Sequence, residues 1–166
     1  MWEIHHFSFW QTIRFIQAQD RFLDKILEHI GTAAFMELLV KLFSSEELKE
    51  GEGIIQYLLD KGLVPKLIEK LDPTLPDSVH FHSGQVLLGI TSIARNFGPK
   101  NLVLEQLKSS YLTAKILEHM VKANAPNINS TLIAGLSVLL DVIQRALGFM
   151  NEGYCLSLCQ GFGNCY

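Results

Sequence analysis

The sequence has 166 residues, of which 48% are hydrophobic and 19% are charged, and its formal net charge is −3. This length fits one ordinary domain, and the composition excludes a disordered charged tail. Lys and Arg do not gather into a basic stripe, which excludes the electrostatic pattern of a nucleic-acid-binding protein.

The first twenty residues are rich in aromatic side chains, and we expect them to be helical from about Ser8. They have no basic region ahead of an apolar one, and Gln11, Thr12 and Arg14 interrupt the apolar residues. The segment therefore does not resemble a signal peptide. We expect a cytoplasmic protein, with the nucleus as a second compartment.

Apolar residues then recur with the period of an α-helix over residues 22–30, 35–43, 54–59 and 63–71. Gly31 is expected to end the first of these helices, and Gly62 to end the third in a left-handed conformation. Pro65 fits the first turn of the fourth, where its missing N–H costs nothing.

Residues 72–77 contain two prolines and two aspartates and are therefore expected to form a loop, after which Asp77 or Ser78 caps the next helix. That helix has an apolar face over residues 86–97, and Gly98-Pro99 is expected to stop it. Shorter helices are predicted near residues 102–107 and 112–121, with a turn around Pro126 and a last helix over residues 132–147. No segment alternates with period two, so we expect almost no sheet.

The most apolar stretch, residues 132–143, contains Ser137 and Asp141 and is shorter than the roughly 20 apolar residues that cross a bilayer. We therefore expect no membrane span. Residues 1–147 are predicted to form the helical domain, and residues 148–166, rich in Gly and Cys, a loose tail. Cys155, Cys159 and Cys165 lack the spacing of a zinc site and are expected to be free thiols.

One short pattern repeats along the chain. The segment KILEHI at residues 25–30 returns as KLIEKL at 66–71 and as KILEHM at 115–120. Repeats of some forty residues built from helix pairs are typical of HEAT and armadillo proteins, in which neighbouring pairs share a continuous core. The predicted fold is therefore an all-α, HEAT/armadillo-like helical repeat solenoid.

The histidines do not have the spacing of metal ligands. His80 and His82 are two residues apart, which places them on nearly opposite faces of a helix. His29 and His119 occupy equivalent repeat positions near helix C-termini, where a protonated imidazole gains from the helix dipole. We therefore predict structural histidines, with no metal and no cofactor.

No catalytic constellation is recognisable either. Four glutamates cluster at residues 46–52, but Gly51 and Gly53 lie among them and Ser44 with Glu47 matches a capping box, so we interpret them as a solvated linker. No nucleophile, base and orienting group come together, and we predict that the protein is not an enzyme.

The segment FLDKILEHIGTAAFMELLVKL at residues 22–42 closely resembles the SAPS family, the regulatory subunits of serine/threonine protein phosphatase 6 and its fungal relatives. The HIGT run at residues 29–32 is its most specific part. Shorter similar blocks follow in the same order at residues 54–58, 71–73, 104–107, 116–120 and 135–140. Residues 80–87 keep Gln85 and Leu87 but otherwise depart from the family pattern, and the resemblance extends from about Arg14 to Leu147.

This resemblance implies a scaffold that binds a phosphatase 6 type catalytic subunit and directs it to substrates, with an ankyrin-repeat subunit as a further partner. Our predicted partner-contact residues are His29, Gly31, Thr32, His80 and Gln85, which lie at helix ends or starts within family-like blocks. For Gly31 and Thr32, a helix stop and an N-cap are the competing structural explanation.

Three alternatives remain open at this point. An armadillo-type adaptor for extended peptides would need regularly spaced Asn and Trp, but Trp occurs only at positions 2 and 10. An enzyme would need a pocket that joins His29, His80 or His82 to an acidic partner. The third is a truncated repeat array without a function of its own, since SAPS proteins are much longer.

Overall fold

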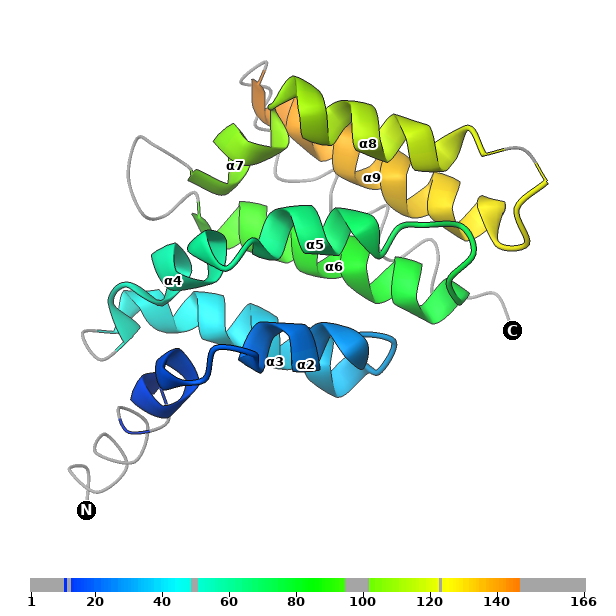
Figure 1. Ribbon diagram of the computed structural model, residues 1–166. Helices are drawn as coiled ribbons and strands as arrows, with labels where there is room; N and C mark the ends of the chain where they lie inside the picture. The colour runs from blue at the N-terminus through cyan, green and yellow to red at the C-terminus, as the bar shows by residue number, and fades with distance from the viewer. Residues whose placement is uncertain (1–10, 12, 49–50, 95–101, 123, 147–166) are drawn as a thin grey trace.

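The regular structure is entirely helical in the part of the chain that the structure describes, which is residues 11, 13–48, 51–94, 102–122 and 124–146. In this computed structural model the helices lie in three successive layers (Figure 1). The predicted all-α fold is thereby confirmed. The predicted stop at Gly98-Pro99 and the predicted tail at 148–166 fall outside the described residues.

Each layer contains one long helix. After a helical segment over residues 13–18, the first layer has α2 (Phe22–Glu28), α3 (Ala33–Ser44) and the 3₁₀ turn η1 (Ser45–Glu47). The second has α4 (Ile54–Asp60), α5 (Leu63–Glu69) and α6 (Asp77–Ala94), and the third has α7 (Leu102–Leu107), α8 (Ser110–Met120) and α9 (Ile128–Ala146). The helices α2, α5 and α8 lie on one side, and α3, α6 and α9 lie on the other (Figure 1).

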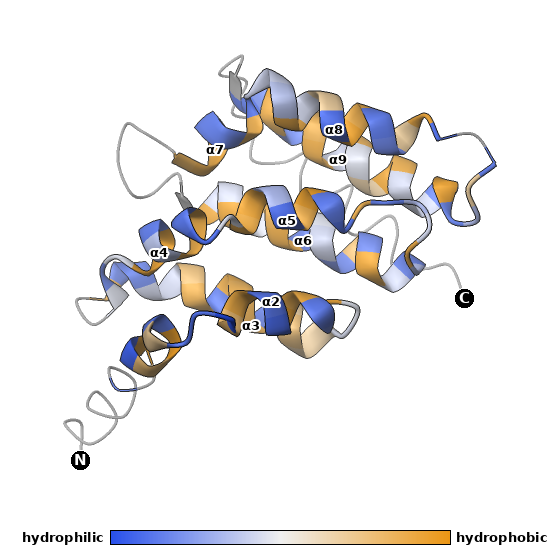
Figure 2. Ribbon diagram, viewed as in Figure 1, coloured by the Kyte–Doolittle hydropathy of each residue, from blue (hydrophilic) through white to orange (hydrophobic). Residues whose placement is uncertain are grey.

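A continuous aliphatic core joins the layers, as the amphipathic periodicity predicts. Figure 2 shows hydrophobic and hydrophilic residues interleaved along the helices. The buried members come from all three layers and include Leu39, Phe43, Leu67, Leu87 and Ile116. Burying one such side chain contributes roughly 1.5–3 kcal/mol, so the shared core is the main source of stability.

Two glycines let α6 approach its neighbours on both sides. A Cβ atom at Gly84 would lie 3.2 Å from the Cβ of Ala134 in α9, and one at Gly89 would lie 3.3 Å from a methyl group of Val40 in α3. A larger side chain at either position would push two layers apart. The residues therefore keep α6 close-packed between α3 and α9.

Two glycines, Gly62 and Gly31, were predicted to end helices, and the structure confirms this for Gly62 only. Gly62 has φ of +78° between α4 and α5, which confirms the predicted left-handed stop. Gly31 has no positive φ, and α2 already ends at Glu28. A Cβ atom at Gly31 would meet Ser78 and Val79 at 3.2 Å, so the absence of a side chain serves a close approach to α6.

The predicted capping box at Ser44 and Glu47 is wrong. Ser44 lies in the last turn of α3 and donates its hydroxyl to the carbonyl of Val40. Glu46 acts as a cap instead, because its carboxylate accepts the backbone N–H groups of Gly53 and Ile55 at 2.8 and 2.9 Å. An anion at the start of α4 satisfies donors that have no partner inside the helix.

Candidate partner-binding surface

His80 fastens α6 to the third layer from inside the fold. Its Nε2 lies 2.8 Å from the carbonyl oxygen of Asp72, and its Nδ1 lies 2.7 Å from the hydroxyl of Ser130. Because a carbonyl can only accept, Nε2 donates its proton to the carbonyl of Asp72. The hydroxyl of Ser130 also lies 2.6 Å from the carboxylate of Asp77, to which it donates. The side chain is fully buried. The ring of His80 thus joins the layers from inside the fold and does not reach the surface, and its contact with a partner stays an untested prediction.

His82 fastens α6 to the first layer. Its Nδ1 donates to the carbonyl of Ile30 at 3.1 Å, in the turn between α2 and α3. His80 and His82 thus point in different directions from α6, as their spacing predicted. Asn127 joins the second and third layers at the same end. Its backbone N–H donates to the carbonyl of Pro73, and its side-chain amide donates to the carbonyl of Leu75.

Asp72 is the charged centre of this end of the fold. Lys122 contacts its carboxylate and holds the pKa of Asp72 well below its usual range, with help from Thr74. His119 lies 3.6 Å from the same carboxylate but is buried, and neither ring nitrogen has a hydrogen-bond partner among the described residues. Burial lowers the pKa of His119, with Lys122 adding to the effect. The helix dipole would favour a protonated ring at this position, but burial outweighs it, and the fold favours the neutral form of His119.

A stripe of exposed and partly exposed residues runs along α6 between its contacts with α9 and with α3. It consists of residues that recur every three or four positions, namely Ser78, Phe81, Gln85, Leu88 and Ser92, and we call it the α6 surface. Gly84 on one border faces α9, and Gly89 on the other faces α3. The α6 surface therefore lies between the two neighbouring long helices.

The turn between α2 and α3 adjoins the N-terminal end of the α6 surface. It is held there by the bond from His82 to Ile30 and by the close approach of Gly31 to Ser78. His29 and Thr32 are exposed, Gly31 and Gln85 are partly exposed, and the ring of His29 stacks on Phe35 at 5.6 Å. The fold thus brings four of the five predicted contact residues to one region, and their contact with a partner stays a prediction.

Sequence reasoning missed Phe81. Its side chain is 55% exposed near the N-terminal end of the α6 surface, with one edge against His82. Exposed aromatic residues are enriched in protein interfaces, where they supply much of the binding energy. The sequence did offer a signal, since Phe81 stands between two histidines near the expected start of a helix. The apolar periodicity alone, however, does not decide whether such a residue lies in the core or on the surface.

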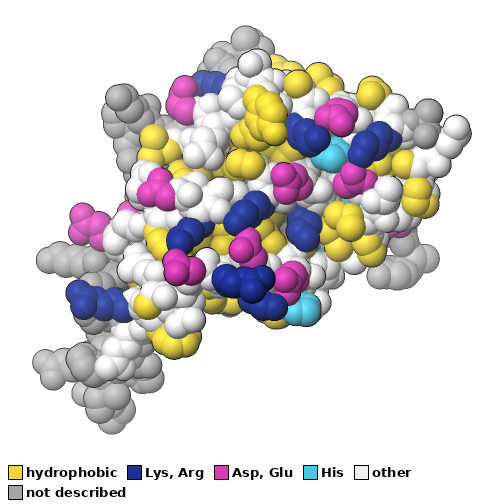
Figure 3. All heavy atoms as spheres, viewed as in Figure 1, with side chains coloured by type: hydrophobic (Ala, Val, Ile, Leu, Met, Phe, Trp, Pro, Cys, Tyr) yellow, Lys and Arg dark blue, Asp and Glu magenta, His cyan; other side chains and the backbone are white. Residues whose placement is uncertain are grey.

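The opposite side of the molecule is charged but balanced. Figure 3 shows Lys and Arg interleaved with Asp and Glu over α2, α5 and α8. Lys66 of α5 contacts Asp24 of α2 at 2.7 Å and lowers the pKa of Asp24. Lys115 contacts Glu118 within α8 at 3.2 Å. Such pairs leave no single-sign field that would steer a strongly charged ligand.

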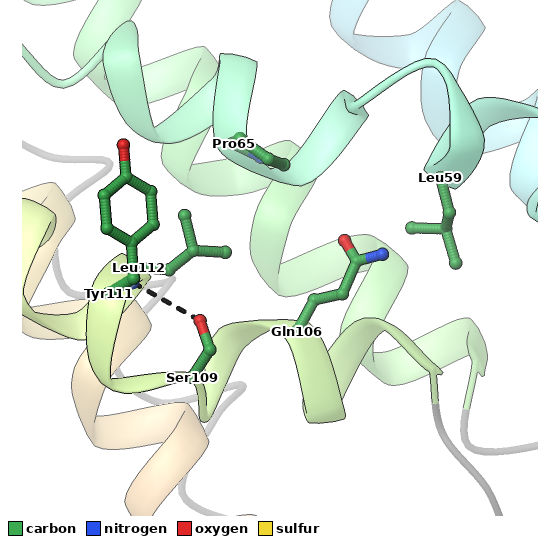
Figure 4. A pocket seen from close by; sticks show the side chains of 6 residues that line it. All are labelled: Leu59, Pro65, Gln106, Ser109, Tyr111 and Leu112. Carbon is green, nitrogen blue, oxygen red and sulfur yellow. Dashed lines mark hydrogen bonds between the residues drawn. The ribbon is translucent and has the colours of Figure 1, made fainter.

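An open depression of about 280 Å³ separates α4 and α5 from α7 and α8. Its lining consists of Leu59, Pro65, Gln106, Ser109, Tyr111 and Leu112 (Figure 4). Ser109 is already engaged, since it caps α8 by accepting the N–H of Leu112 at 3.3 Å. The lining brings no acid, base and nucleophile together, so the depression is a shallow apolar recess of the surface.

The described residues contain no group of three or more His, Cys, Asp or Glu side chains arranged to hold a metal ion. Within the same residues, no helix has the length and apolar character needed to cross a bilayer.

The sequence is similar to one family and to several curated proteins. The family described as "SIT4 phosphatase-associated protein" matches residues 7–153. "Extragenic suppressor of kinetochore protein 1" of Schizosaccharomyces pombe is 31% identical over 141 residues, which cover 81% of this chain and 17% of that protein. Human "Serine/threonine-protein phosphatase 6 regulatory subunit 2" is 27% identical over 165 residues, which cover 94% of this chain and 17% of that protein.

"SIT4-associating protein SAP185" of Saccharomyces cerevisiae is 27% identical over 141 residues, which cover 80% of this chain and 13% of that protein. The chain thus spans less than a fifth of the length of these relatives. No solved structure matches the chain.

Proposed function

The chain belongs to the family of SIT4 phosphatase-associated proteins, the SAPS family, and on this premise we propose that it is a non-enzymatic regulatory segment that binds a phosphatase 6 type catalytic subunit. The observation that carries the proposal is the family match over residues 7–153, together with relatives named as phosphatase 6 regulatory subunits and SIT4-associating proteins. Bound in this way, the catalytic subunit would be directed to its substrates. An ankyrin-repeat subunit as a further partner, and residence in the cytoplasm and nucleus, belong to the same proposal.

We also propose that the three layers are repeats of a HEAT/armadillo-like solenoid. Three pairs, α2 with α3, α5 with α6 and α8 with α9, follow one another in the same order and stack through equivalent helices. The recurring KILEH segment supports this proposal because it falls on α2 and again on α8. Solenoids of this kind offer a row of equivalent helices as an extended binding surface.

The α6 surface with the adjoining α2–α3 turn is our proposed contact region. It presents Phe81 and Gln85 between two helices, with His29, Gly31 and Thr32 at one end. An exposed aromatic ring next to amide, hydroxyl and imidazole groups suits a protein interface, in which an apolar anchor is surrounded by polar contacts. The charged face over α2, α5 and α8 is a weaker candidate, because exposed ion pairs contribute little to affinity.

The test is capture of a purified phosphatase 6 type catalytic subunit by the full chain, by a chain without residues 148–166, and by the variants Phe81→Ser and Gln85→Ala. Tyr111→Ser is the matched control, because Tyr111 is also an exposed aromatic residue but lies on α8. We expect capture by the first two proteins and by the control. Loss of the Phe81 ring should weaken binding at least about tenfold, the effect of an interface anchor.

The possible results distinguish two hypotheses, that the chain binds the phosphatase and that it does so through the α6 surface. If the full chain, shown to be helical by circular dichroism, captures no phosphatase, the regulatory role is contradicted. If capture occurs but Phe81→Ser and Gln85→Ala bind as tightly as the control, the role stands and the α6 surface is wrong.

A further inference from the structure

His119 is a buried polar residue that the fold leaves without a bond. It is only 3% exposed, and neither ring nitrogen has a hydrogen-bond partner among the described residues. Buried polar groups are bonded in the large majority of cases, so an unbonded one calls for an explanation. Without bonds, nothing replaces the lost water when such a ring becomes charged. The surroundings of His119 therefore decide what a proton on the ring does to the fold.

The burial of this position differs between the three layers. In the recurring segment, His119 corresponds to His29 after α2 and to Lys70 after α5. His29 is exposed and Lys70 is partly exposed. His119 instead continues the buried stripe of α8, which contains Leu112 and Ile116 at helical spacing. The repeat places a polar residue here, and only the packing of the third layer on the second encloses it.

The loop between α5 and α6 adjoins the ring. The carboxylate of Asp72 in this loop lies 3.6 Å from Nδ1 of His119 and forms an ion pair with Lys122, which follows α8. At the same end of the fold, the backbone N–H of Asn127 donates to the carbonyl of Pro73 at 3.1 Å. These contacts hold the C-terminal end of α8 against the loop. We call Asp72, His119, Lys122 and Asn127 the latch.

Charged groups surround the ring on several elements. They are, by element, Lys115, Glu118 and Lys122 in and after α8, Asp72 in the α5–α6 loop, Glu69 in α5, and Glu105 paired with Lys108 in α7. The α9 helix has no charged residue between positions 128 and 140. Lys122 already occupies the carboxylate of Asp72, which is the anion that His119 approaches. Burial, with Lys122 adding to it, therefore lowers the pKa of His119 although Asp72 acts in the opposite direction.

We propose that the latch is sensitive to protons: a proton on His119 releases the C-terminal end of α8 from the α5–α6 loop while the rest of the core stays folded. A charged imidazole gains most from water, and this end of α8 reaches water by moving away from the loop. The movement separates Lys122 from Asp72 and leaves both charges hydrated. Deprotonation reverses it, because the neutral ring loses less when it is buried again.

The release stays local because the third layer has other joints to the second. Thr91 of α6 bonds Asp141 of α9 at 2.9 Å, and Gly84 of α6 lies directly against Ala134 of α9. The latch contributes no residue to these joints. It contributes none to the α6 surface either, so proton sensitivity and phosphatase binding are separate properties of the chain.

The test is native-state hydrogen exchange of the full chain at pH 8 and pH 5, in urea concentrations below the unfolding transition. The protection of each amide is taken relative to an open peptide at the same pH. We expect the amides of Asn127 and of the last turn of α8 to lose protection at least about threefold at pH 5, since the open form binds the proton more tightly. Their exchange should depend only weakly on urea, because local opening exposes little surface.

Two variants and a control assign the effect to His119. His119→Leu and His119→Gln should both abolish the loss of protection, because neither side chain titrates. His29→Leu should preserve it, because His29 occupies the equivalent position but is exposed. Equal protection at pH 5 and pH 8 in the wild type, or a loss that persists in both His119 variants, would overturn the proposal. So would a loss with the full urea dependence of the core amides of α3 and α6, since the proton would then act only on global unfolding.

Discussion

Thr91 of α6 and Asp141 of α9 form a buried hydrogen bond of 2.9 Å between the second and third layers. The carboxylate also accepts the Nε–H group of Arg145 at 2.7 Å. The Thr91 hydroxyl is also within reach of the carbonyls of Leu87 and Leu88, but a charged acceptor forms the stronger bond. This triad is the one place in the described core where a carboxylate is almost fully buried.

We expect Asp141→Ala to lower the free energy of unfolding by about 2–4 kcal/mol, because it leaves Arg145 without its anion next to a buried hydroxyl. Thr91→Val should cost about 1–2 kcal/mol, since Arg145 still pairs with Asp141. Urea unfolding of both variants and of the double variant measures the coupling between them. A coupling close to zero would show that the two side chains do not stabilise each other. Ser137→Ala, on the exposed part of α9, is the control and should change the stability by less than about 0.5 kcal/mol.

The two histidines of α6 should differ in their contribution to stability. His80→Phe keeps most of the ring volume but removes both hydrogen bonds of a fully buried side chain, so we expect a loss of about 2–3 kcal/mol. His82→Phe removes a bond from a partly exposed ring, where water can replace it, so we expect about 1 kcal/mol or less. Denaturant unfolding compares the two, and equal losses would contradict the structural role assigned to His80.

Stability should fall between neutral and mildly acidic pH because of His119. Burial lowers its pKa in the folded protein below the ordinary value of 6.5, so the unfolded chain binds more protons. The free energy of unfolding is therefore highest above pH 6.5 and decreases as the pH falls through that value. The groups around the ring act in both directions: Lys122 and Lys115 favour the neutral form, whereas Asp72 and Glu118 favour the charged one.

His119→Leu removes the titrating group and should flatten this pH dependence, with its largest stabilisation relative to the wild type near pH 5. The measurement is the thermal midpoint at pH 5 and pH 8 for both proteins. Asp72 does not affect the comparison between pH 5 and pH 8. Its pKa is lowered in the folded protein, so its contribution to stability is lost only as the pH falls below the ordinary carboxyl value of 3.8. The same slope in both proteins would rule out His119 as its source.

Glu46→Gln should destabilise the start of α4. The carboxylate accepts two backbone N–H groups there, and a neutral amide forms weaker bonds with only one oxygen, so we expect a cost of about 1 kcal/mol. Glu52→Gln is the matched control, because Glu52 is an exposed glutamate of the same acidic segment. Urea unfolding distinguishes them, and equal effects would indicate that the general charge of the segment matters and the cap does not.

The sequence by itself determined the helices, because helix formation and amphipathic burial depend on neighbours three and four residues apart. The loop at residues 72–77 and the left-handed turn at Gly62 follow from local backbone chemistry and were predicted for that reason. The recurring segment also indicated equivalent positions in α2 and α8, and the resemblance carried by residues 22–42 identified the family before any contact was known.

Only the tertiary structure decided which polar side chains are available. His29 and His119 occupy equivalent repeat positions, yet His29 is exposed while His119 is buried. His80 and Phe81 are adjacent, yet the polar ring is inside and the apolar ring is outside. Glu46 caps a helix seven residues further along the chain. Each outcome depends on which layer packs against which face of a helix, and that is set by contacts between residues distant in sequence, which no local period encodes.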